Sequence, residues 1–312
     1  MKTGIIGTGN FSPKVLNLLS GIDNVQVIGG YDSSSIEEFS AFNSLEDMLD
    51  QVDLCIVLDP IATGVDEMAS IIRSGKHLYI ESPSLCSRQD LRKLEMLAYE
   101  ADVILQIGLK QRFYNFYNDL EKYALVPRII DSNRFIKFNK NSTQLSVIDD
   151  LMAHDIDVSL KLSNSEVKSV YATAVGVYYK DPDVVNARIE FYNGCVANLS
   201  ASKIADKNKH MTKFFQNNTY CSIDYLDQML KVQNNQADKK NHSEEHWGVK
   251  TTYNQSKDSD GYISILEKEL NSFYHCIRTN SDTDAGISQY LQLKSVAEQI
   301  KEQLERNFIT NV

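Results

Sequence analysis

Residues 3–21 read TGIIGTGNFSPKVLNLLSG and combine an apolar strand, a glycine turn and the start of an amphipathic helix. Gly7 and Gly9 follow the strand directly, which is the context that a dinucleotide-binding turn requires. Gly7 suits the tight turn, and Gly9 lets the backbone approach a pyrophosphate. The helix that begins near Ser12-Pro13 offers free N–H groups and a positive dipole end to that anion.

The turn lacks the third glycine of the full fingerprint, because Ser12 stands there, but serine is small and a good helix N-cap. Asn10 and Phe11 lie within the turn and are predicted to contact the cofactor. The next strand, VQVIGGYD, ends in Asp32, whose carboxylate can accept both adenosine-ribose hydroxyls and would repel a 2′-phosphate. We therefore expect NAD, with NADP less favoured; the alternative is that Asp32 only caps the following helix.

Strands and helices alternate through about residue 125. Short apolar runs separated by amphipathic helices indicate a parallel sheet that is covered on both faces. The predicted strands cover residues 3–7, 25–32, 53–60, 77–83 and 103–109, and the helices cover residues 12–21, 44–51, 66–75 and 87–101. This is an α/β fold whose N-terminal part is a Rossmann-like, doubly wound domain.

The rhythm changes after residue 128 to longer, alternating runs that are rich in β-branched and aromatic residues. Asn193-Gly194 between two such runs predicts a hairpin with a type I′ turn. One helix interrupts the strands at 146–163, and two more close the chain at about 263–279 and 287–306. We expect a dinucleotide-binding domain at 1–124 and an α+β domain with a large, mostly antiparallel, open-faced sheet at 125–312. An alternative for the C-terminal helix is that it packs back on the first domain.

Composition excludes several classes of function. The net charge of −10 is unfavourable for a nucleic-acid binder, which needs a basic surface. No apolar run approaches the length of about 18 residues that a membrane helix needs, and the N-terminus has no apolar signal segment. The five cysteines include no CxxC pair, so we expect buried thiols rather than a zinc site or a disulfide framework. A cytoplasmic protein with no nucleic-acid or membrane partner is expected.

Three further segments, GKHLYIESP, GLKQRF and DDLMAHDID, follow the glycine turn in a characteristic order. With them, the chain resembles the glucose–fructose oxidoreductase / inositol dehydrogenase (Gfo/Idh/MocA) family over essentially its full length. Within that family, it looks most like the branch that acts on UDP-N-acetylglucosamine, including its 3-dehydrogenases. The resemblance implies hydride transfer between a nicotinamide and a sugar carbon. It also implies a homodimer or homotetramer that pairs through the C-terminal sheet.

The resemblance also assigns the turn after the fourth strand to the nicotinamide side. Glu81 and Pro83 match the family's Glu-Lys-Pro turn, but Ser82 stands where relatives have a lysine that touches the nicotinamide ribose and the reacting hydroxyl. Serine carries no charge and cannot serve as a base near neutral pH. The segment DPIATG is a second departure, with Asp59 before Pro60 where relatives have threonine and Gly64 where they have histidine.

In DDLMAHDID, Asp150, His154 and Asp157 are spaced so that one α-helix presents them on one face. In the family, the matching aspartate and histidine point into the cleft beside the nicotinamide. Imidazole has a pKa near working pH, so His154 is predicted as the acid/base, with Asp150 orienting it or binding a sugar hydroxyl. The alternatives are a buried structural histidine and a metal site formed by the three side chains; the family uses no metal.

GLKQRF follows the last strand of the first domain, so Lys110 and Arg112 are predicted to leave its carboxyl edge toward a substrate. An alternative role for Lys110 is to replace, in space, the lysine that is missing from the turn. Arg112 suits either a substrate diphosphate or a structural contact, since a guanidinium fork fits both. Asp157 completes the expected substrate contacts.

These observations predict an NAD-dependent dehydrogenase that acts on a ring carbon of a sugar, with a UDP-linked N-acetylamino sugar as the expected substrate. Ser82, Asp59 and Gly64 motivate a different class, a catalytically silent or regulatory homologue that binds NAD or a sugar nucleotide. A third hypothesis keeps catalysis on another substrate, as in biliverdin reductase-like relatives that also lack the turn lysine.

Overall fold

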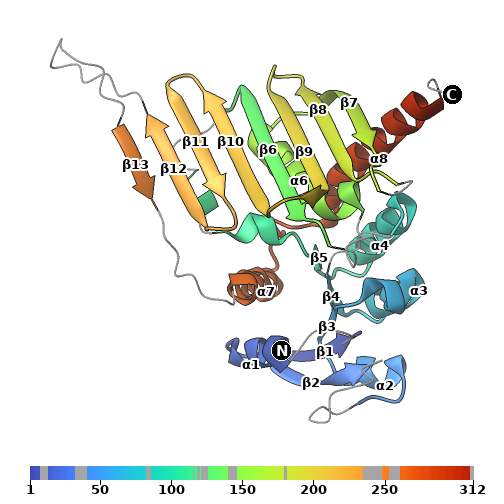
Figure 1. Ribbon diagram of the computed structural model, residues 1–312. Helices are drawn as coiled ribbons and strands as arrows, with labels where there is room; N and C mark the ends of the chain where they lie inside the picture. The colour runs from blue at the N-terminus through green and yellow to red at the C-terminus, as the bar shows by residue number, and fades with distance from the viewer. Residues whose placement is uncertain are drawn as a thin grey trace. The chain divides into compact units, whose positions relative to one another are not determined.

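The structure of the chain is a computed structural model (Figure 1). It describes residues 1–7, 13–31, 41–81, 86–114, 116–117, 120, 126–139, 146–178, 181–234, 248–252 and 261–309. The chain forms two compact units, Met1–Tyr114 with Ser259–Leu291 and Asn115–Asp258 with Gln292–Val312. Helix α8 (Ile287–Ile309) continues from the first unit into the second.

The first unit contains a five-stranded parallel sheet in the order β2-β1-β3-β4-β5. Its strands are β1 (Lys2–Ile6), β2 (Gln26–Tyr31), β3 (Leu54–Val57), β4 (His77–Ile80) and β5 (Leu105–Ile107). The central strand β3 is buried along its whole length, as parallel strands covered on both faces are. The strand order reverses between β1 and β3, and ligands of such sheets bind beyond the carboxyl ends of the strands at that point.

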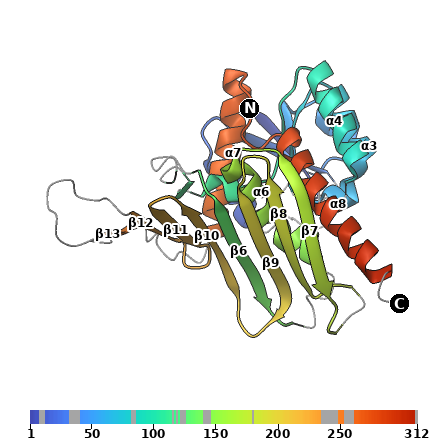
Figure 2. The same cartoon turned by 90° about the horizontal axis from the view of Figure 1, so that it is seen from above.

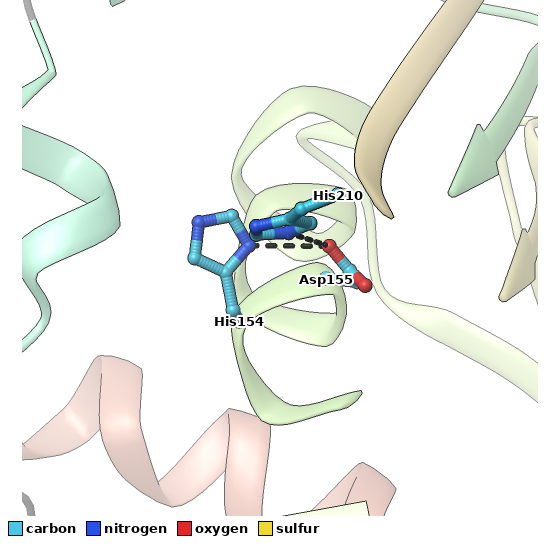
Figure 3. Close-up of side chains that lie close together, drawn as sticks. All are labelled: His154, Asp155 and His210. Atoms are coloured by element: carbon cyan, nitrogen blue, oxygen red, sulfur yellow. Dashed lines mark hydrogen bonds and ion pairs between the residues drawn. The ribbon is translucent and has the colours of Figure 1, made fainter. Parts of the chain in front are cut away.

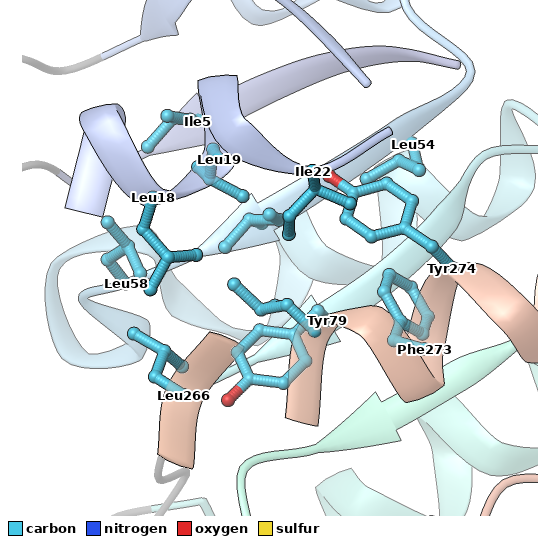
Figure 4. Close-up of a cluster of buried hydrophobic side chains, with 12 residues drawn as sticks. Ile5, Leu18, Leu19, Ile22, Leu54, Leu58, Tyr79, Leu266, Phe273 and Tyr274 are labelled. Atoms are coloured by element: carbon cyan, nitrogen blue, oxygen red, sulfur yellow. The ribbon is translucent and has the colours of Figure 1, made fainter. Parts of the chain in front are cut away.

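Helices complete the first unit and enclose its core. They are α1 (Pro13–Gly21), α2 (Leu45–Leu49), α3 (Pro60–Arg73), α4 (Arg88–Glu100) and α7 (Gly261–Thr279), with the 3₁₀ helix η1 (Lys110–Phe113). Leu19 of α1, Tyr79 of β4 and Phe273 of α7 belong to one buried cluster, drawn in Figure 4, and all three have no exposed surface. Burying each such side chain contributes about 1.5–3 kcal/mol, so α7 belongs to this core although it follows the second sheet in sequence.

The second unit contains an eight-stranded sheet in the order β13-β12-β11-β10-β6-β9-β8-β7. All neighbouring strands are antiparallel except β6 and β9, which are parallel. The strands are β6 (Ile129–Lys137), β7 (Val167–Val175), β8 (Val184–Phe191), β9 (Val196–Ala205), β10 (Lys209–Gln216), β11 (Thr219–Asp224), β12 (Met229–Asn234) and β13 (Gly248–Thr252). The sequence did not predict β12.

The two faces of this sheet differ. The π-helix η3 (Val147–Met152) and helix α6 (Ala153–Ser163) pack on one face, against β6 and β9 (Figures 1 and 2). Along β10, His210, Thr212 and Phe214 point to this covered face and are buried. The opposite face exposes large apolar side chains, among them Ile129, Tyr171 and Phe215. The sheet is therefore open on one side, as expected from the sequence.

The hairpin between β8 and β9 is confirmed, but its predicted turn type is wrong. Gly194 has a φ of +84°, whereas Asn193 is not among the residues with positive φ, as a type I′ turn would require. The Asn193 side-chain oxygen instead accepts a hydrogen bond from the N–H of Cys195 (3.0 Å). The Gly194 N–H donates to the carbonyl of Phe191 (3.0 Å), and the loop between β8 and β9 is longer than the two residues of a type I′ turn. Only the glycine position needed the left-handed conformation.

Two further expectations concern cysteines and membranes. All five cysteines are buried free thiols. None of the helices in the described ranges has the length and apolar character needed to cross a membrane.

Candidate functional site

The carboxyl ends of β1 and β3 bring Gly7 against Asp59. Gly7 has a φ of +72°, and its N–H donates to the carbonyl of Tyr31 (3.3 Å). A β-carbon at Gly7 would lie 2.8 Å from the β-carbon of Asp59. Both the backbone conformation and the lack of space therefore require glycine. This turn lies where the strand order reverses, the position at which the sequence predicts a bound pyrophosphate.

Several predicted cofactor contacts lie outside the described residues. They are Gly9, Asn10, Phe11, Asp32, Ser82 and Pro83. The roles predicted for these six residues stay predictions. Pro60 begins α3, and Glu81 follows β4 directly.

Helix α3 is interrupted where relatives were expected to carry histidine. Gly64 has φ 74° and ψ 160°, which is not helical. Before it, the carbonyl of Asp59 accepts hydrogen bonds from the N–H (3.1 Å) and the hydroxyl (2.8 Å) of Thr63. A β-carbon at Gly64 would meet no atom within 4 Å, but the positive φ would strain any side chain. The glycine is thus explained by the local backbone.

A cluster of ionisable side chains lies at the carboxyl end of β4. Lys110 of η1 forms an ion pair with Glu81, and its side chain keeps 26% of its exposure. The Tyr79 hydroxyl lies 2.8 Å from the second oxygen of Glu81 and 3.0 Å from a carboxyl oxygen of Glu269 in α7. The other oxygen of Glu269 accepts the N–H of Leu109 (2.6 Å). The turn after β4 therefore begins at a fixed charge pair.

The proton count of this cluster can be worked out from its contacts. A tyrosine hydroxyl has one proton, so it cannot donate to both carboxylates at once. Burial, and then the charge of Glu81, raise the pKa of Glu269 to about 8. Protonated Glu269 can donate to the oxygen of Tyr79, while Tyr79 donates to Glu81. This arrangement leaves Glu81 as the carboxylate that faces Lys110.

Arg112 is anchored within the first unit. One of its terminal nitrogens donates a hydrogen bond to the backbone carbonyl of Asp284 (2.6 Å). This contact supports the structural alternative for Arg112, and its contact with a substrate stays a prediction.

In the second unit, two histidines converge on one carboxylate oxygen (Figure 3). The Nδ1 atom of His154 lies 3.1 Å from Oδ1 of Asp155, and the Nε2 atom of His210 lies 3.0 Å from the same oxygen. His154 and Asp155 lie in the first turn of α6, and His210 lies on the covered face of β10. Asp155 is 1% exposed. Among the described residues, the Nε2 atom of His154 has no hydrogen-bond partner.

Aromatic contacts and charge fix this cluster. The ring of Tyr225 stacks on His210, with centroids 4.1 Å apart, and meets the edge of His154 at 4.6 Å. Burial, and then the nearby His154, lower the pKa of His210 to about 4. Burial alone would raise the pKa of Asp155, but the hydrogen bonds from His154 and His210 hold that pKa well below its usual value. The cluster is therefore an ionised carboxylate between two imidazoles, of which His210 is neutral.

The predicted role of Asp150 in orienting the His154 ring is wrong. Residues 147–152 form a π-helix, so the spacing that places Asp150 and His154 on one α-helical face does not apply. The Asp150 carboxylate accepts the N–H of Ser146 (2.6 Å), and Asp155 orients the imidazole instead. Asp150 is exposed, so its predicted contact with a sugar hydroxyl stays open as a prediction.

Asp157 is more deeply buried than His154, although the sequence predicts both side chains on one helix face. Its side chain is 0% exposed, whereas His154 keeps 13% of its side-chain exposure. The metal-site alternative is not supported, because Asp150, His154 and Asp157 do not form a group of neighbouring ligand atoms among the described residues. A different trio, His154, Asp155 and His210, has ligand atoms within 4.8 Å of one another.

Sequence reasoning missed four polar residues that complete the two clusters. They are Tyr79, Asp155, His210 and Glu269. The signal for Asp155 was present, since it adjoins His154 and a carboxylate is the usual partner of a functional imidazole. His210 stands on an alternating strand, and Glu269 is far from Glu81 in sequence, so neither had a local signal.

Comparison with known families decides the assignment. The family model described as "Oxidoreductase family, NAD-binding Rossmann fold" matches residues 1–109, and the "GFO/IDH/MocA C-terminal domain" model matches residues 128–220. The chain belongs to the Gfo/Idh/MocA oxidoreductase family. It is an NAD-dependent dehydrogenase, and the resemblance stated from its sequence motifs is confirmed.

Curated and solved relatives agree with this membership. The chain is 27% identical over 239 residues to a UDP-N-acetylglucosamine 3-dehydrogenase of Acidithiobacillus ferrooxidans, covering 74% of this chain and 76% of that one. It is 25% identical over 169 residues to a scyllo-inositol 2-dehydrogenase (NAD(+)) of Bacillus subtilis, covering 49% of each chain. A solved structure of the A. ferrooxidans enzyme has the same fold, with a TM-score of 0.87 at 24% identity and 98% coverage of both chains.

The residues present fit NAD. At Gly7 the turn after β1 has positive φ and no room for a side chain, as the tight turn of a dinucleotide site requires. Helix α1 follows this turn, and its N-terminus has the dipole polarity that favours an anion.

Proposed function

We propose that the protein oxidises a ring hydroxyl of a UDP-linked N-acetylamino sugar. The observation that carries the chemistry is the His154 imidazole. Asp155 holds its Nδ1, and its Nε2 is a buried atom with no hydrogen-bond partner among the described residues. The substrate class is supported by the 27% identity to the UDP-N-acetylglucosamine 3-dehydrogenase over 74% of the chain. By that likeness, the reacting carbon is C3 of the sugar.

The proton of the reacting hydroxyl needs an acceptor when the carbon loses hydride. Bound NAD supplies the hydride acceptor. His154 takes the hydroxyl proton at Nε2 while its Nδ1–H donates to Asp155, and the imidazolium that results is stabilised by that carboxylate. The O–H and C–H bonds break and a carbonyl forms, so the products are a keto sugar, reduced cofactor and one proton on His154.

Lys110 is the proposed source of the positive charge that relatives draw from the lysine at the position of Ser82. Its ion pair with Glu81 places the ammonium beside the residue that precedes Ser82 in the chain. An ammonium there can donate hydrogen bonds to the reacting hydroxyl or to a ribose, which is the role that the resemblance gives to the missing lysine. Ser82 then contributes only a hydroxyl group to the same turn.

Contacts with the rest of the substrate are proposed from charge and exposure. Asp150 is exposed and can accept a sugar hydroxyl. Arg112 carries a planar guanidinium, whose fork of donors suits a diphosphate, and one of its nitrogens donates to Asp284. Asp157 is buried, and its contact with a substrate stays a prediction.

The open face of the second sheet is the proposed surface for a homodimer or homotetramer. It exposes Ile129 (46%), Tyr171 (54%) and Phe215 (38%), and solvent-exposed aromatics on a sheet of this size favour an interface. Light scattering on the wild type and on Tyr171→Glu would test this. The proposal expects an oligomer that the substitution weakens, and a wild-type monomer would overturn it.

One assay tests the proposed substrate. Purified protein is mixed with NAD and UDP-N-acetylglucosamine, and the absorbance of reduced nicotinamide is followed. Turnover that His154→Gln abolishes and His275→Gln leaves intact supports the proposal; His275 is an exposed histidine of α7. No turnover on a panel of sugar nucleotides, with NAD still bound by calorimetry, would favour the silent homologue. Turnover only on unrelated substrates would favour the third hypothesis.

A further inference from the structure

The strand register places Arg134 directly opposite His210. In the antiparallel pair β6–β10, these two residues are partners, and both side chains point to the face that carries α6. A terminal nitrogen of Arg134 lies 3.1 Å from Nδ1 of His210. A guanidinium can only donate, so Nδ1 of His210 must be the acceptor.

That contact fixes the proton on the other side of the His210 ring. If Nδ1 accepts, neutral His210 carries its proton on Nε2, and it donates this proton to Oδ1 of Asp155 (3.0 Å). The burial of His210 and its lowered pKa, about 4, keep the ring neutral at working pH. Asp155 remains an ionised acceptor and receives the Nδ1–H of His154 at the same oxygen.

We propose that Arg134 and His210 are positioning residues that hold His154 in the tautomer with the proton on Nδ1 and the lone pair on Nε2. This inference deepens the proposed function and rests on it for its catalytic meaning, since a general base must present a lone pair to the hydroxyl. The wrong tautomer would present an N–H there and could not take a proton.

The contact between Arg134 and His210 also argues against a metal ion bound by His154, Asp155 and His210. A divalent metal bound by His154, Asp155 and His210 would take the Nε2 lone pair of His210. The Nδ1 of a metal-bound histidine then normally donates its proton to a carboxylate or carbonyl. Here Nδ1 faces the guanidinium of Arg134, which offers no acceptor.

Other charged and titratable groups surround the cluster. Tyr225 stacks on His210, and its hydroxyl lies 3.1 Å from that of Tyr117. Asp157 acts on Tyr117 by its charge, and the ammonium of Lys161 lies 5.5 Å from the centre of the Tyr117 ring. Burial raises the pKa of Tyr117 well above its usual value, so the Tyr117 phenol stays neutral.

The test uses the full-length protein labelled with ¹⁵N in its histidine rings. The proposal expects ring shifts of the Nδ1–H form for neutral His154 and of the Nε2–H form for His210, assigned through His154→Gln and His210→Gln. An Nε2–H form of His154 in the wild type would overturn it. So would stoichiometric binding of added Zn²⁺ that shifts both rings. No substrate is needed, so a failure of the proposed function leaves this measurement unaffected.

Kinetics on three variants separate positioning from mere packing. His210→Gln keeps an N–H for Asp155 and an oxygen for Arg134, so it should retain the wild-type kcat and pH profile. His210→Met and Arg134→Met should lower kcat by at least about tenfold at unchanged KM. His210→Met should also move the acidic limb of kcat to higher pH, because Asp155 loses a donor. Arg92→Met, at an exposed position of α4, is the control.

Two results would overturn the assignment of these residues. One is a His210→Met variant whose kcat, and whose acidic limb in the pH profile of kcat, both match those of the wild type. The other is a loss in His210→Gln as large as that in His210→Met. If His210→Met fails to fold, Arg134→Met and the ring shifts decide the question on their own.

Discussion

The ammonium of Lys110 pairs with the carboxylate of Glu81, the residue that immediately precedes Ser82 in the chain. By the resemblance, relatives carry a lysine at the position of Ser82, and this protein has a positive charge from a different segment paired with the residue before that position. We infer from this ion pair that Lys110 replaces the catalytic lysine that is missing at residue 82, and this replacement can be tested.

Removal of Lys110 should therefore be rescued by restoring the family's residue. We expect Lys110→Met to lower kcat by about 10²-fold or more, the lower range for loss of a proton-handling group. Ser82→Lys introduced into Lys110→Met should recover most of that loss. Steady-state kinetics with NAD and the sugar nucleotide provide the measurement.

The matched control for this pair is Lys93→Met, which removes an exposed lysine of α4 that pairs with Asp66. It should leave kcat unchanged. Full activity of Lys110→Met would remove Lys110 from the mechanism, and failure of Ser82→Lys to improve Lys110→Met would show that the two lysines are not equivalent.

Gly7 should be needed for both stability and NAD affinity. A β-carbon there would lie 2.8 Å from that of Asp59, and the positive φ adds about 1–2 kcal/mol for a non-glycine residue. We expect Gly7→Ala to lower the free energy of unfolding and to weaken NAD binding in calorimetry. Gly21→Ala is the control, because a β-carbon at Gly21 has no atom within 4 Å. Equal NAD affinity in the two variants would contradict the assigned turn.

Glu269 should make stability depend on pH. Its pKa is raised from 4.5 to about 8 in the folded state, chiefly by burial. Between these two values the folded chain holds a proton that the unfolded chain has released, so the free energy of unfolding falls as pH rises through that window. Glu269→Gln mimics the protonated side chain and should remove this loss.

Urea unfolding at about pH 5 and pH 8 measures the effect of Glu269 directly. The variant should match the wild type at the lower pH and exceed it in stability at the higher pH. Glu100→Gln, at an exposed position of α4, should behave as the wild type does at both. A constant difference between Glu269→Gln and the wild type would mean that Glu269 is ionised throughout.

The first unit was predictable because its signals are local. Each strand of the parallel sheet is a short apolar run, and Gly7 directly follows the first strand, where the tight turn needs a positive φ. The π-helix at 147–152 was not predictable from periodicity, since its residues give the same pattern as an α-helix. It changes which carboxylate meets His154, and so the sequence named Asp150 where the structure has Asp155.

The partners of the candidate site were hidden for a different reason. Arg134 and His210 meet only because β6 and β10 pair in a particular register, and Glu269 meets Tyr79 only because α7 joins the first unit. Contacts between distant segments leave no spacing in the sequence, whereas the pairing of His154 with its neighbour Asp155 did leave one.

The most direct test of the central claim follows the hydrogen on the reacting carbon. UDP-N-acetylglucosamine carrying deuterium at C3 is incubated with NAD and the wild-type protein, and the reduced cofactor is examined by mass spectrometry. The proposal predicts that the deuterium appears in the nicotinamide and that His154→Gln slows this transfer by about 10²–10⁴-fold. Reduced cofactor without deuterium, or transfer at an unchanged rate in His154→Gln, would contradict it.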